Sequence, residues 1–232
     1  MRGLKLGLGF SSPAAAGASE FTPASIASLV SWHDATDAAT ISATGGLVDS
    51  WTDKSGNGNT FTSTTTSRPT TASRTQNSLN VLDFDGGDHM VMSSFGATES
   101  QVNTLYIAGV FDSTAGSQYM VDGIDLLNRN GLLITASNFT ALSGSFLIHS
   151  AADTLFHIFK VVYNSTSSII GVDGSDVSGN AGTQGTNGLT IGKAYNLIFP
   201  MNGAIGEVLF FNAALSAGDE ANLVSYLSRW GV

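Results

Sequence analysis

The sequence predicts an all-β domain of antiparallel strands, arranged as a sandwich or a barrel. Three observations predict this fold class. About a dozen short strand-like segments follow one another closely, glycine-containing turn signals separate them, and no helix is expected between them. The composition agrees, because only 12% of the 232 residues are charged, whereas 30 Ser and 23 Thr supply neutral polar surface. This mixture is typical of secreted, surface or virion proteins.

Length and charge limit the function classes. The length suits one large β domain, placed at residues 21–232 behind an N-terminal segment at residues 1–20. A net charge of -9, with nine scattered basic residues, argues against nucleic-acid binding, which needs a basic stripe. The absence of Cys excludes disulfides and thiolate zinc sites. No apolar run approaches the roughly 18 residues of a membrane-spanning helix, so no membrane span is expected.

The first 20 residues are open to three interpretations. Basic residues followed by small ones up to Ala18 resemble a signal peptide, but its apolar stretch is interrupted by glycines. A floppy tail is the default for a chain end. An extended docking arm is favoured, because apolar side chains at every second position would share one face and add to a sheet edge or a groove of a partner: Leu4, Leu6, Leu8 and Phe10.

The domain itself is expected to start with one helical turn at Thr22–Ala27, with Thr22 as its N-cap and Pro23 at the first helical position. Alternating apolar residues then predict strands at 29–33, 47–52, 60–63, 81–84, 90–92, 104–111, 118–121, 132–136, 142–148, 156–163, 168–172, 189–192 and 204–211. The polar stretch 63–78 is expected to be a long loop, and 176–187 a hairpin tip.

One longer helix is expected near the C-terminus. Ser216 is placed to cap it, and Asp219 and Glu220 favour the positive end of its dipole. Gly231 is expected to end it. An apolar stripe at helical spacing predicts packing against the sandwich: Leu223, Val224, Leu227 and Trp230.

Several motifs in a fixed order resemble a known family. The two most specific are the W-x-D-K-S-G-N-G-N run at residues 51–59 and the G-x-I-G-E-V run at residues 203–208. Together with Trp32-His33-Asp34-Ala35 and Leu82-Asp83-Phe84-Asp85-Gly86-Gly87-Asp88, they make residues 28–230 resemble the laminin-G-like, or concanavalin-A-like, jelly-roll family in its bacterial and phage form. The resemblance implies a two-sheet jelly-roll sandwich. The fold hosts lectins, glycanases, adhesins and virion proteins, so it implies no single activity.

Residues inside these motifs are interpreted mainly as structural. Asp and Asn side chains in the 53–59 run are expected to cap their own turn, with glycines in left-handed conformations. Trp32 and Trp51 are expected in the core. By period two, Glu207 is expected on the same strand face as Ile205, Leu209 and Phe211. A buried carboxylate is therefore expected there, either hydrogen-bonded within the fold or facing a ligand.

The carboxylates needed for glycoside hydrolysis are not apparent. A glycanase of this family carries Glu-x-Asp-x-x-Glu on one strand, whereas this chain has only Glu20, Glu99, Glu207 and Glu220, none paired at strand spacing. A non-enzymatic protein is therefore expected.

Calcium is the one cofactor considered, because related folds hold it in loops through Asp, Asn and carbonyl oxygens. The candidate loops contain Asp83, Asp85 and Asp88, and separately Asp122 and Asp125, with a further pair at Asp173 and Asp176. Asp-Gly is also the ordinary hairpin dipeptide, and no EF-hand spacing occurs. The expectation is therefore no cofactor, with calcium as the open alternative.

The predicted function is a non-enzymatic structural protein of a bacteriophage virion, as a head decoration, head fibre or tail fibre. Its arm would dock onto other virion proteins, homo-oligomers are expected, and host surface glycans are the candidate ligand. The predicted location is the virion surface. The alternative is a secreted or cell-surface bacterial carbohydrate-binding module or adhesin.

Overall fold

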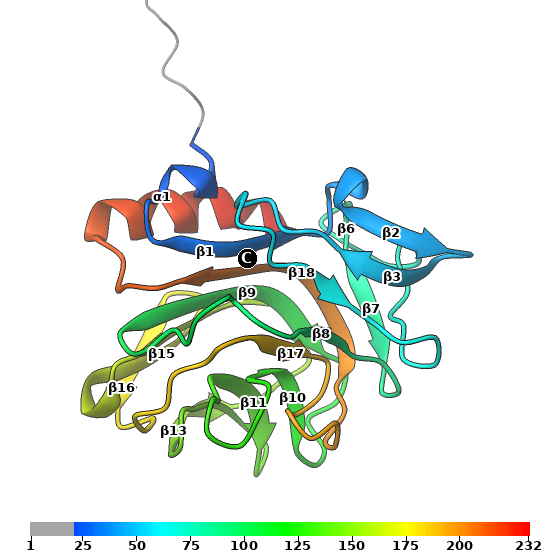
Figure 1. The fold of residues 1–232 in the computed structure, drawn as a ribbon. Helices are drawn as coiled ribbons and strands as arrows, with labels where there is room; N and C mark the ends of the chain where they lie inside the picture. The colour runs from blue at the N-terminus through cyan, green and yellow to red at the C-terminus, as the bar shows by residue number, and fades with distance from the viewer. Residues whose placement is uncertain (1–20) are drawn as a thin grey trace, which may run out of the picture.

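The computed structural model describes residues 21–232, which fold into two stacked antiparallel sheets with one α-helix on the outside (Figure 1). This confirms the predicted fold class. The predicted arm residues Leu4, Leu6, Leu8 and Phe10 lie outside the described residues. Among residues 21–232, no helix combines the length and the apolar character needed to cross a membrane.

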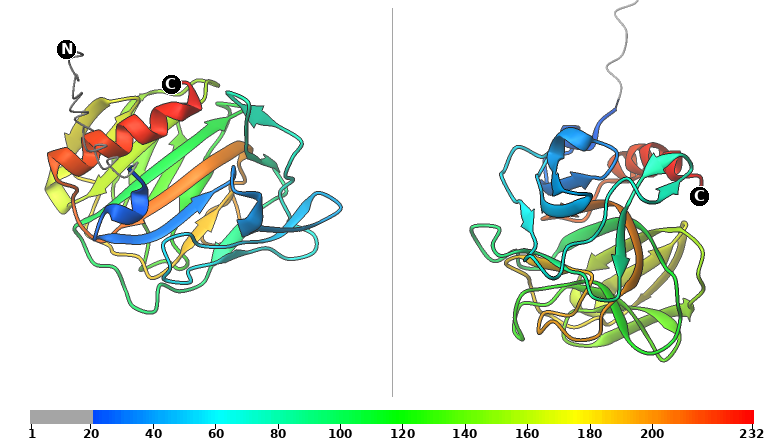
Figure 2. Two further views of the ribbon diagram at one scale, coloured as in Figure 1. Left: turned by 90° about the horizontal axis from the view of Figure 1, so that it is seen from above. Right: turned by 90° about the vertical axis from the view of Figure 1, so that its right-hand side faces the viewer.

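The first sheet carries the helix on its outer face (Figure 2). Its strand order is β1-β18-β9-β14-β15-β16, and β7 pairs with the same edge of β18 beyond β1. The bounds are β1 Leu29–Asp34, β7 Leu82–Asp85, β9 Asn103–Phe111, β14 His157–Tyr163, β15 Ser168–Val172, β16 Ser175–Gly179 and β18 Asn202–Phe211.

The second sheet has the order β13-β12-β11-β10-β17-β8-β4-β3-β2, and a separate hairpin pairs β5 with β6. The bounds are β2 Ile41–Thr44, β3 Leu47–Trp51, β4 Phe61–Thr62, β5 Thr75–Gln76, β6 Leu79–Asn80, β8 Met90–Met92, β10 Gln118–Asp122, β11 Gly131–Thr135, β12 Asn138–Leu142, β13 Phe146–Ala151 and β17 Leu189–Ile191.

Two apolar cores hold these layers together. The larger core lies between the sheets, where alternate residues of facing strands interdigitate, including Trp51, Phe61, Phe159 and Phe210. The smaller core lies between the first sheet and the helix α1 (Ala217–Leu227), which continues as a 3₁₀ turn over Ser228–Trp230. The helix therefore covers a sheet face that would otherwise be exposed.

The helix starts and ends as its sequence predicts. The Ser216 hydroxyl accepts from the Asp219 backbone N–H at 3.1 Å, and Gly231 follows with a φ of 82°. Leu223, Leu227 and Trp230 are fully buried. The predicted burial of Val224 is wrong, because Val224 lies at the rim of the helix face and remains 47% exposed.

Strand β18 contains an irregularity that the period-two pattern does not predict. Its pairing with β9 shifts between Ile205 and Glu207, so Gly206 forms a bulge. Ile205 therefore faces the inter-sheet core, whereas Glu207 faces the helix with Leu209 and Phe211. A Cβ on Gly206 would lie 2.4 Å from the Trp230 ring, so only glycine allows this approach.

Two further local predictions are wrong. The segment 142–148 is not one strand, because Gly144, at a φ of 100°, turns the chain between β12 and β13. The segment 176–187 is not simply a hairpin tip, because its start pairs with β15 as β16. The predicted first helical turn is confirmed as a 3₁₀ helix over Pro23–Ser25, with Thr22 at the N-cap position and Pro23 first in the turn, although the Thr22 side chain makes no capping hydrogen bond.

Candidate functional site

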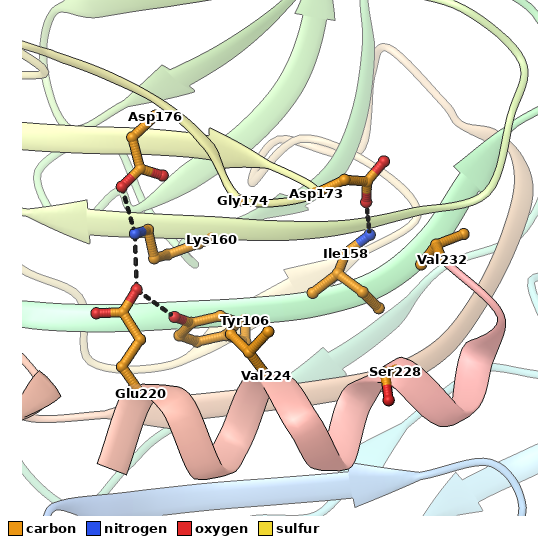
Figure 3. Close-up of a pocket in the computed structure, with 10 residues that line it drawn as sticks. All are labelled: Tyr106, Ile158, Lys160, Asp173, Gly174, Asp176, Glu220, Val224, Ser228 and Val232. Carbon is orange, nitrogen blue, oxygen red and sulfur yellow. Dashed lines mark hydrogen bonds and ion pairs between the residues drawn. The ribbon is translucent and has the colours of Figure 1, made fainter. Parts of the chain in front are cut away.

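A groove lies where α1 crosses the outer face of the first sheet (Figure 3). Its deepest part has a volume of about 140 Å³. Strand β14 brings Ile158 and Lys160 to this face, because their neighbours Phe159 and Val161 point into the inter-sheet core. The other lining residues come from β9, from the β15–β16 hairpin and from the C-terminal helix: Tyr106, Asp173, Gly174, Asp176, Glu220, Val224, Ser228 and Val232.

The Lys160 ammonium group makes ion pairs with two carboxylates that line this groove. Lys160 Nζ lies 2.6 Å from an Asp176 carboxylate oxygen and 2.8 Å from one of Glu220. The Tyr106 hydroxyl donates to the same Glu220 oxygen at 3.2 Å. Burial opposes the charge of Lys160, but the two carboxylates outweigh it and raise the pKa of Lys160. The groove therefore keeps a fixed positive charge between two negative ones.

His157 makes an ion pair that positions Asp173, one of the residues that line the groove. His157 Nδ1 lies 2.6 Å from Asp173 Oδ2, and Nε2 lies 2.8 Å from Asp153 Oδ1. The second oxygen of Asp173 accepts from the Ile158 backbone N–H at 2.8 Å. Burial lowers the pKa of His157, but the two aspartates outweigh it, and the net pKa is raised above 6.5. Asp173 is thereby fixed at the junction of the groove with a second hollow.

The second hollow extends the groove past the end of the helix. It has a volume of about 570 Å³ and shares Asp173 and Val232 with the first. Its walls include the exposed Leu155 side chain and the buried Phe156 ring. Arg74, which also lines this hollow, makes two hydrogen bonds of 2.7 Å to Asp112. The two adjoining hollows together present both apolar and charged side chains.

This arrangement suits a neutral polyhydroxyl ligand. The carboxylates of Asp173, Asp176 and Glu220 accept hydrogen bonds from hydroxyl groups, and the ammonium of Lys160 donates them. Ile158, Val224 and Val232 present apolar surface to the same space. An anionic ligand is disfavoured, because three carboxylates surround one ammonium.

The raised pKa of His157 predicts that the stability of the fold depends on pH. A folded-state pKa above 6.5 stabilises the fold fully below pH 6.5, and this contribution is lost as the pH rises through the raised pKa. We expect the melting temperature of the wild type to fall between pH 6 and pH 9 by more than that of His157→Gln. Parallel losses in the two proteins, measured by calorimetry, would contradict the assignment.

The aspartates predicted from the sequence do not form one site. Asp83 and Asp85, from β7, and Asp88 line a hollow of about 270 Å³ together with Arg68. Burial, together with the nearby Asp85 carboxylate, raises the pKa of Asp88 to about 6. Asp122, the last residue of β10, and Asp125, in the turn that follows, lie elsewhere. Asp122 is buried and pairs with Arg129 at 2.7 Å, whereas Asp125 accepts from the backbone of its own turn. Within residues 21–232, no group of three or more His, Asp or Glu side chains is arranged to hold a metal ion.

Glu207 is occupied within the fold. Oε1 accepts from Trp32 Nε1 at 2.7 Å and from the Tyr226 hydroxyl at 3.0 Å. Oε2 accepts from Arg229 at 2.6 Å and from Trp230 Nε1 at 3.0 Å. Burial raises the pKa of Glu207, and the Arg229 guanidinium opposes that rise. Four donors around one carboxylate leave no lone pair for a ligand, so this side chain joins β1, β18 and α1.

Sequence reasoning missed Lys160, His157 and the role of Glu220. Asp173 and Asp176 were considered for calcium, and Glu220 for the helix dipole. One signal was available: a lysine between Ile158 and Val162 on the alternating strand 157–163 indicates a half-buried cation. Its partners come from β16 and α1, which no local pattern connects to it.

Comparisons with known proteins identify the fold but not a family. No family model and no curated protein matches the sequence. Among solved structures, Trypanosoma rangeli sialidase in complex with sialic acid matches with a TM-score of 0.60 at 17% identity, over 94% of this chain and 35% of that chain. Domain 4 of AbnA, a GH43 extracellular arabinanase from Geobacillus stearothermophilus, in complex with arabinotriose, matches with a TM-score of 0.59 at 11% identity, over 86% of this chain and 99% of the domain.

The binding domain of Botulinum neurotoxin DC, in complex with rat synaptotagmin II, matches with a TM-score of 0.59 at 12% identity, over 86% of this chain and 52% of that chain. The chain spans about a third of the length of the sialidase structures. Identities this low show the fold alone, which is a jelly-roll-like β-sandwich.

Proposed function

We propose that this chain is a non-enzymatic glycan-binding β-sandwich and that the groove beside α1 binds a neutral oligosaccharide. The observation that carries the proposal is the groove's mixed lining, in which apolar side chains line the same space as the Lys160–Asp176–Glu220 network. Pockets that combine apolar surface with a few fixed polar groups are typical of small-ligand sites. A domain with a similar fold was solved with arabinotriose bound, and a sialidase of which about a third has a similar fold was solved in complex with sialic acid.

The absence of catalysis is part of the proposal. Glycoside hydrolysis needs one carboxylic acid that gives a proton and a second carboxylate that acts as nucleophile or base. In the groove, Asp176 and Glu220 both neutralise the same ammonium. This arrangement supports binding rather than proton transfer.

The proposal is tested by binding of the full chain to an array of neutral oligosaccharides, followed by calorimetric titration of the best ligand. Asp176→Asn is expected to weaken binding about tenfold, because it weakens a hydrogen bond to a charged group. Glu99→Gln is the matched control: it also removes one negative charge, and the Glu99 side chain makes no hydrogen bond in the described chain. No binding by the wild type, or equal binding by both variants, would contradict the proposal.

We further propose that the domain is displayed on a bacteriophage virion, anchored through residues 1–20. The support is the alternation of Leu4, Leu6, Leu8 and Phe10 and the resemblance to phage-type jelly rolls. Deletion of residues 1–18 is expected to abolish incorporation into particles without unfolding residues 21–232. Secretion of the intact protein by a bacterial host, with no particle association, would favour the cell-surface module instead.

A further inference from the structure

The loop between β17 and β18 exposes consecutive apolar residues, and two of them have unfavourable backbone conformations. Leu197, Ile198 and Phe199 are 46%, 48% and 45% exposed, and Pro200 follows them in solvent. Leu197 and Phe199 have φ values of 62° and 56°, in the left-handed region that bulky side chains avoid. Consecutive exposed apolar residues in strained conformations are expected where a loop contacts something outside the fold.

The strained loop is fixed against the outer face of the second sheet. The Tyr119 backbone N–H donates to the Phe199 carbonyl at 3.1 Å, and the Tyr195 N–H donates to Asp122 Oδ2 at 3.0 Å. The rings of Tyr119 and Phe199 stack with centroids 6.1 Å apart. The loop therefore presents the Phe199 ring in a defined orientation.

An arginine with unused donors lies beside this ring stack. Arg129 Nε and Nη2 donate to the two oxygens of the buried Asp122, at 3.1 and 2.7 Å, and Nη2 also donates to the Tyr119 hydroxyl at 3.2 Å. The guanidinium carbon lies 4.6 Å from the Tyr195 ring centroid and 5.6 Å from that of Tyr119. Within residues 21–232, the Nη1 donors of Arg129 have no hydrogen-bond partner.

We propose that Arg129, Tyr119, Tyr195 and Phe199 form a second sugar subsite, which binds the carboxylate of an acidic sugar. A guanidinium with free donors recognises a carboxylate, and the apolar face of a sugar ring packs on an aromatic ring. This proposal deepens the proposed glycan-binding function and rests on it. It assigns the acidic sugar to the outer face of the second sheet, whereas the groove at the first sheet favours neutral sugars.

A carboxylate at a peptide C-terminus would offer Arg129 the same charge. The sugar is favoured because the Phe199 ring, which is 45% exposed and stacked on Tyr119 beside Arg129, offers apolar surface for the flat face of a pyranose. The two ligand classes are separated by the experiment.

The experiment measures binding of the full chain to three pairs, each an acidic saccharide and its neutral counterpart: cellobiouronic acid and cellobiose, digalacturonic acid and α-1,4-galactobiose, and 3′-sialyllactose and lactose. The members of the first two pairs differ only in carboxyl groups, whereas 3′-sialyllactose carries a whole additional acidic sugar. At least one acidic member is expected to bind about tenfold or more tightly than its neutral partner. Lack of a preference in all three pairs overturns the proposal, as does equal binding of a short peptide with a free C-terminus.

Two glycine variants separate binding from folding. Phe199→Gly removes the ring and relieves the left-handed conformation, so it is expected to keep the fold while binding of the acidic sugar falls about tenfold. Leu197→Gly relieves the same kind of strain but leaves the ring stack intact, and its binding is expected to be unchanged. Equal binding by both variants overturns the proposal.

Arg129→Lys and Asp176→Asn distinguish this subsite from the groove. Arg129→Lys is expected to remove the preference for the acidic member, since lysine lacks the outer Nη1 donors that a guanidinium bonded to Asp122 keeps free. Asp176→Asn is expected to leave that preference intact. If neutral sugars fail to bind but the acidic preference persists and is lost in Arg129→Lys, the groove proposal fails and the Arg129 subsite stands.

Discussion

Replacing Glu207 with alanine is expected to destabilise the protein by about 3–5 kcal/mol, because it removes the acceptor of a buried ion pair and leaves its donors unsatisfied. The carboxylate is fully buried and accepts from Trp32, Tyr226, Arg229 and Trp230. Urea unfolding followed by intrinsic fluorescence measures the loss.

The control for this prediction is Glu99→Gln, expected within about 0.5 kcal/mol of the wild type because no side-chain contact is lost. Glu207→Gln is expected to fall between the two, since its amide keeps one acceptor oxygen but adds donors facing donors. A loss below about 1 kcal/mol for Glu207→Ala would mean that water replaces the carboxylate at this position.

Replacing Asp53 with alanine is expected to cost about 3 kcal/mol, because hydrogen bonds to buried charged groups contribute more than neutral ones. Asp53 accepts from the backbone N–H groups of Trp32, Ser55 and Asn59 at 2.9, 2.8 and 3.1 Å, and from the Ser55 hydroxyl at 2.7 Å. These bonds join the 53–59 turn to β1, so two segments more than 20 residues apart are expected to loosen together.

Asp37→Ala is the matched control. Asp37 is another aspartate that accepts from a backbone N–H, that of Ala39 at 3.2 Å, but it is only half-buried and its other contact is an ion pair with Lys54 at 3.0 Å. Its loss is expected to be about 1 kcal/mol, as for an ordinary cap. Equal losses for Asp53→Ala and Asp37→Ala would show that the 53–59 turn is not a special element of the fold.

Local patterns were sufficient for much of the fold. The strand over 168–172 and that over 90–92 match the structure because each has an alternating pattern bounded by turn residues. The 53–59 motif forms the predicted turn, with Gly56 and Gly58 at φ values of 91° and 80°. The Gly206 bulge was not predictable, because it depends on the Trp230 ring packing against the strand from a helix 24 residues later.

The candidate site was harder to predict than the fold. Lys160, Asp176 and Glu220 lie on three different elements, and each alone is ordinary for its position. Their meeting depends on the pairing of β14 with β15 and of β15 with β16, and on where α1 crosses the sheet. Arg129 was missed for a related reason, since Tyr195 reaches it, and Phe199 reaches Tyr119, only because their loop folds back over β10.

Phe21, the first described residue, packs against Tyr226 of α1, with ring centroids 6.2 Å apart. The start of the described chain therefore lies next to the helix. Both ends of the described chain lie on the side of the helix (Figure 2). Arg129 lies in the connection between β10 and β11, which belong to the other sheet. A support attached at Phe21 would thus approach the domain from the helix side. The sheet that bears Arg129 would face outward, whereas the groove would lie close to the support.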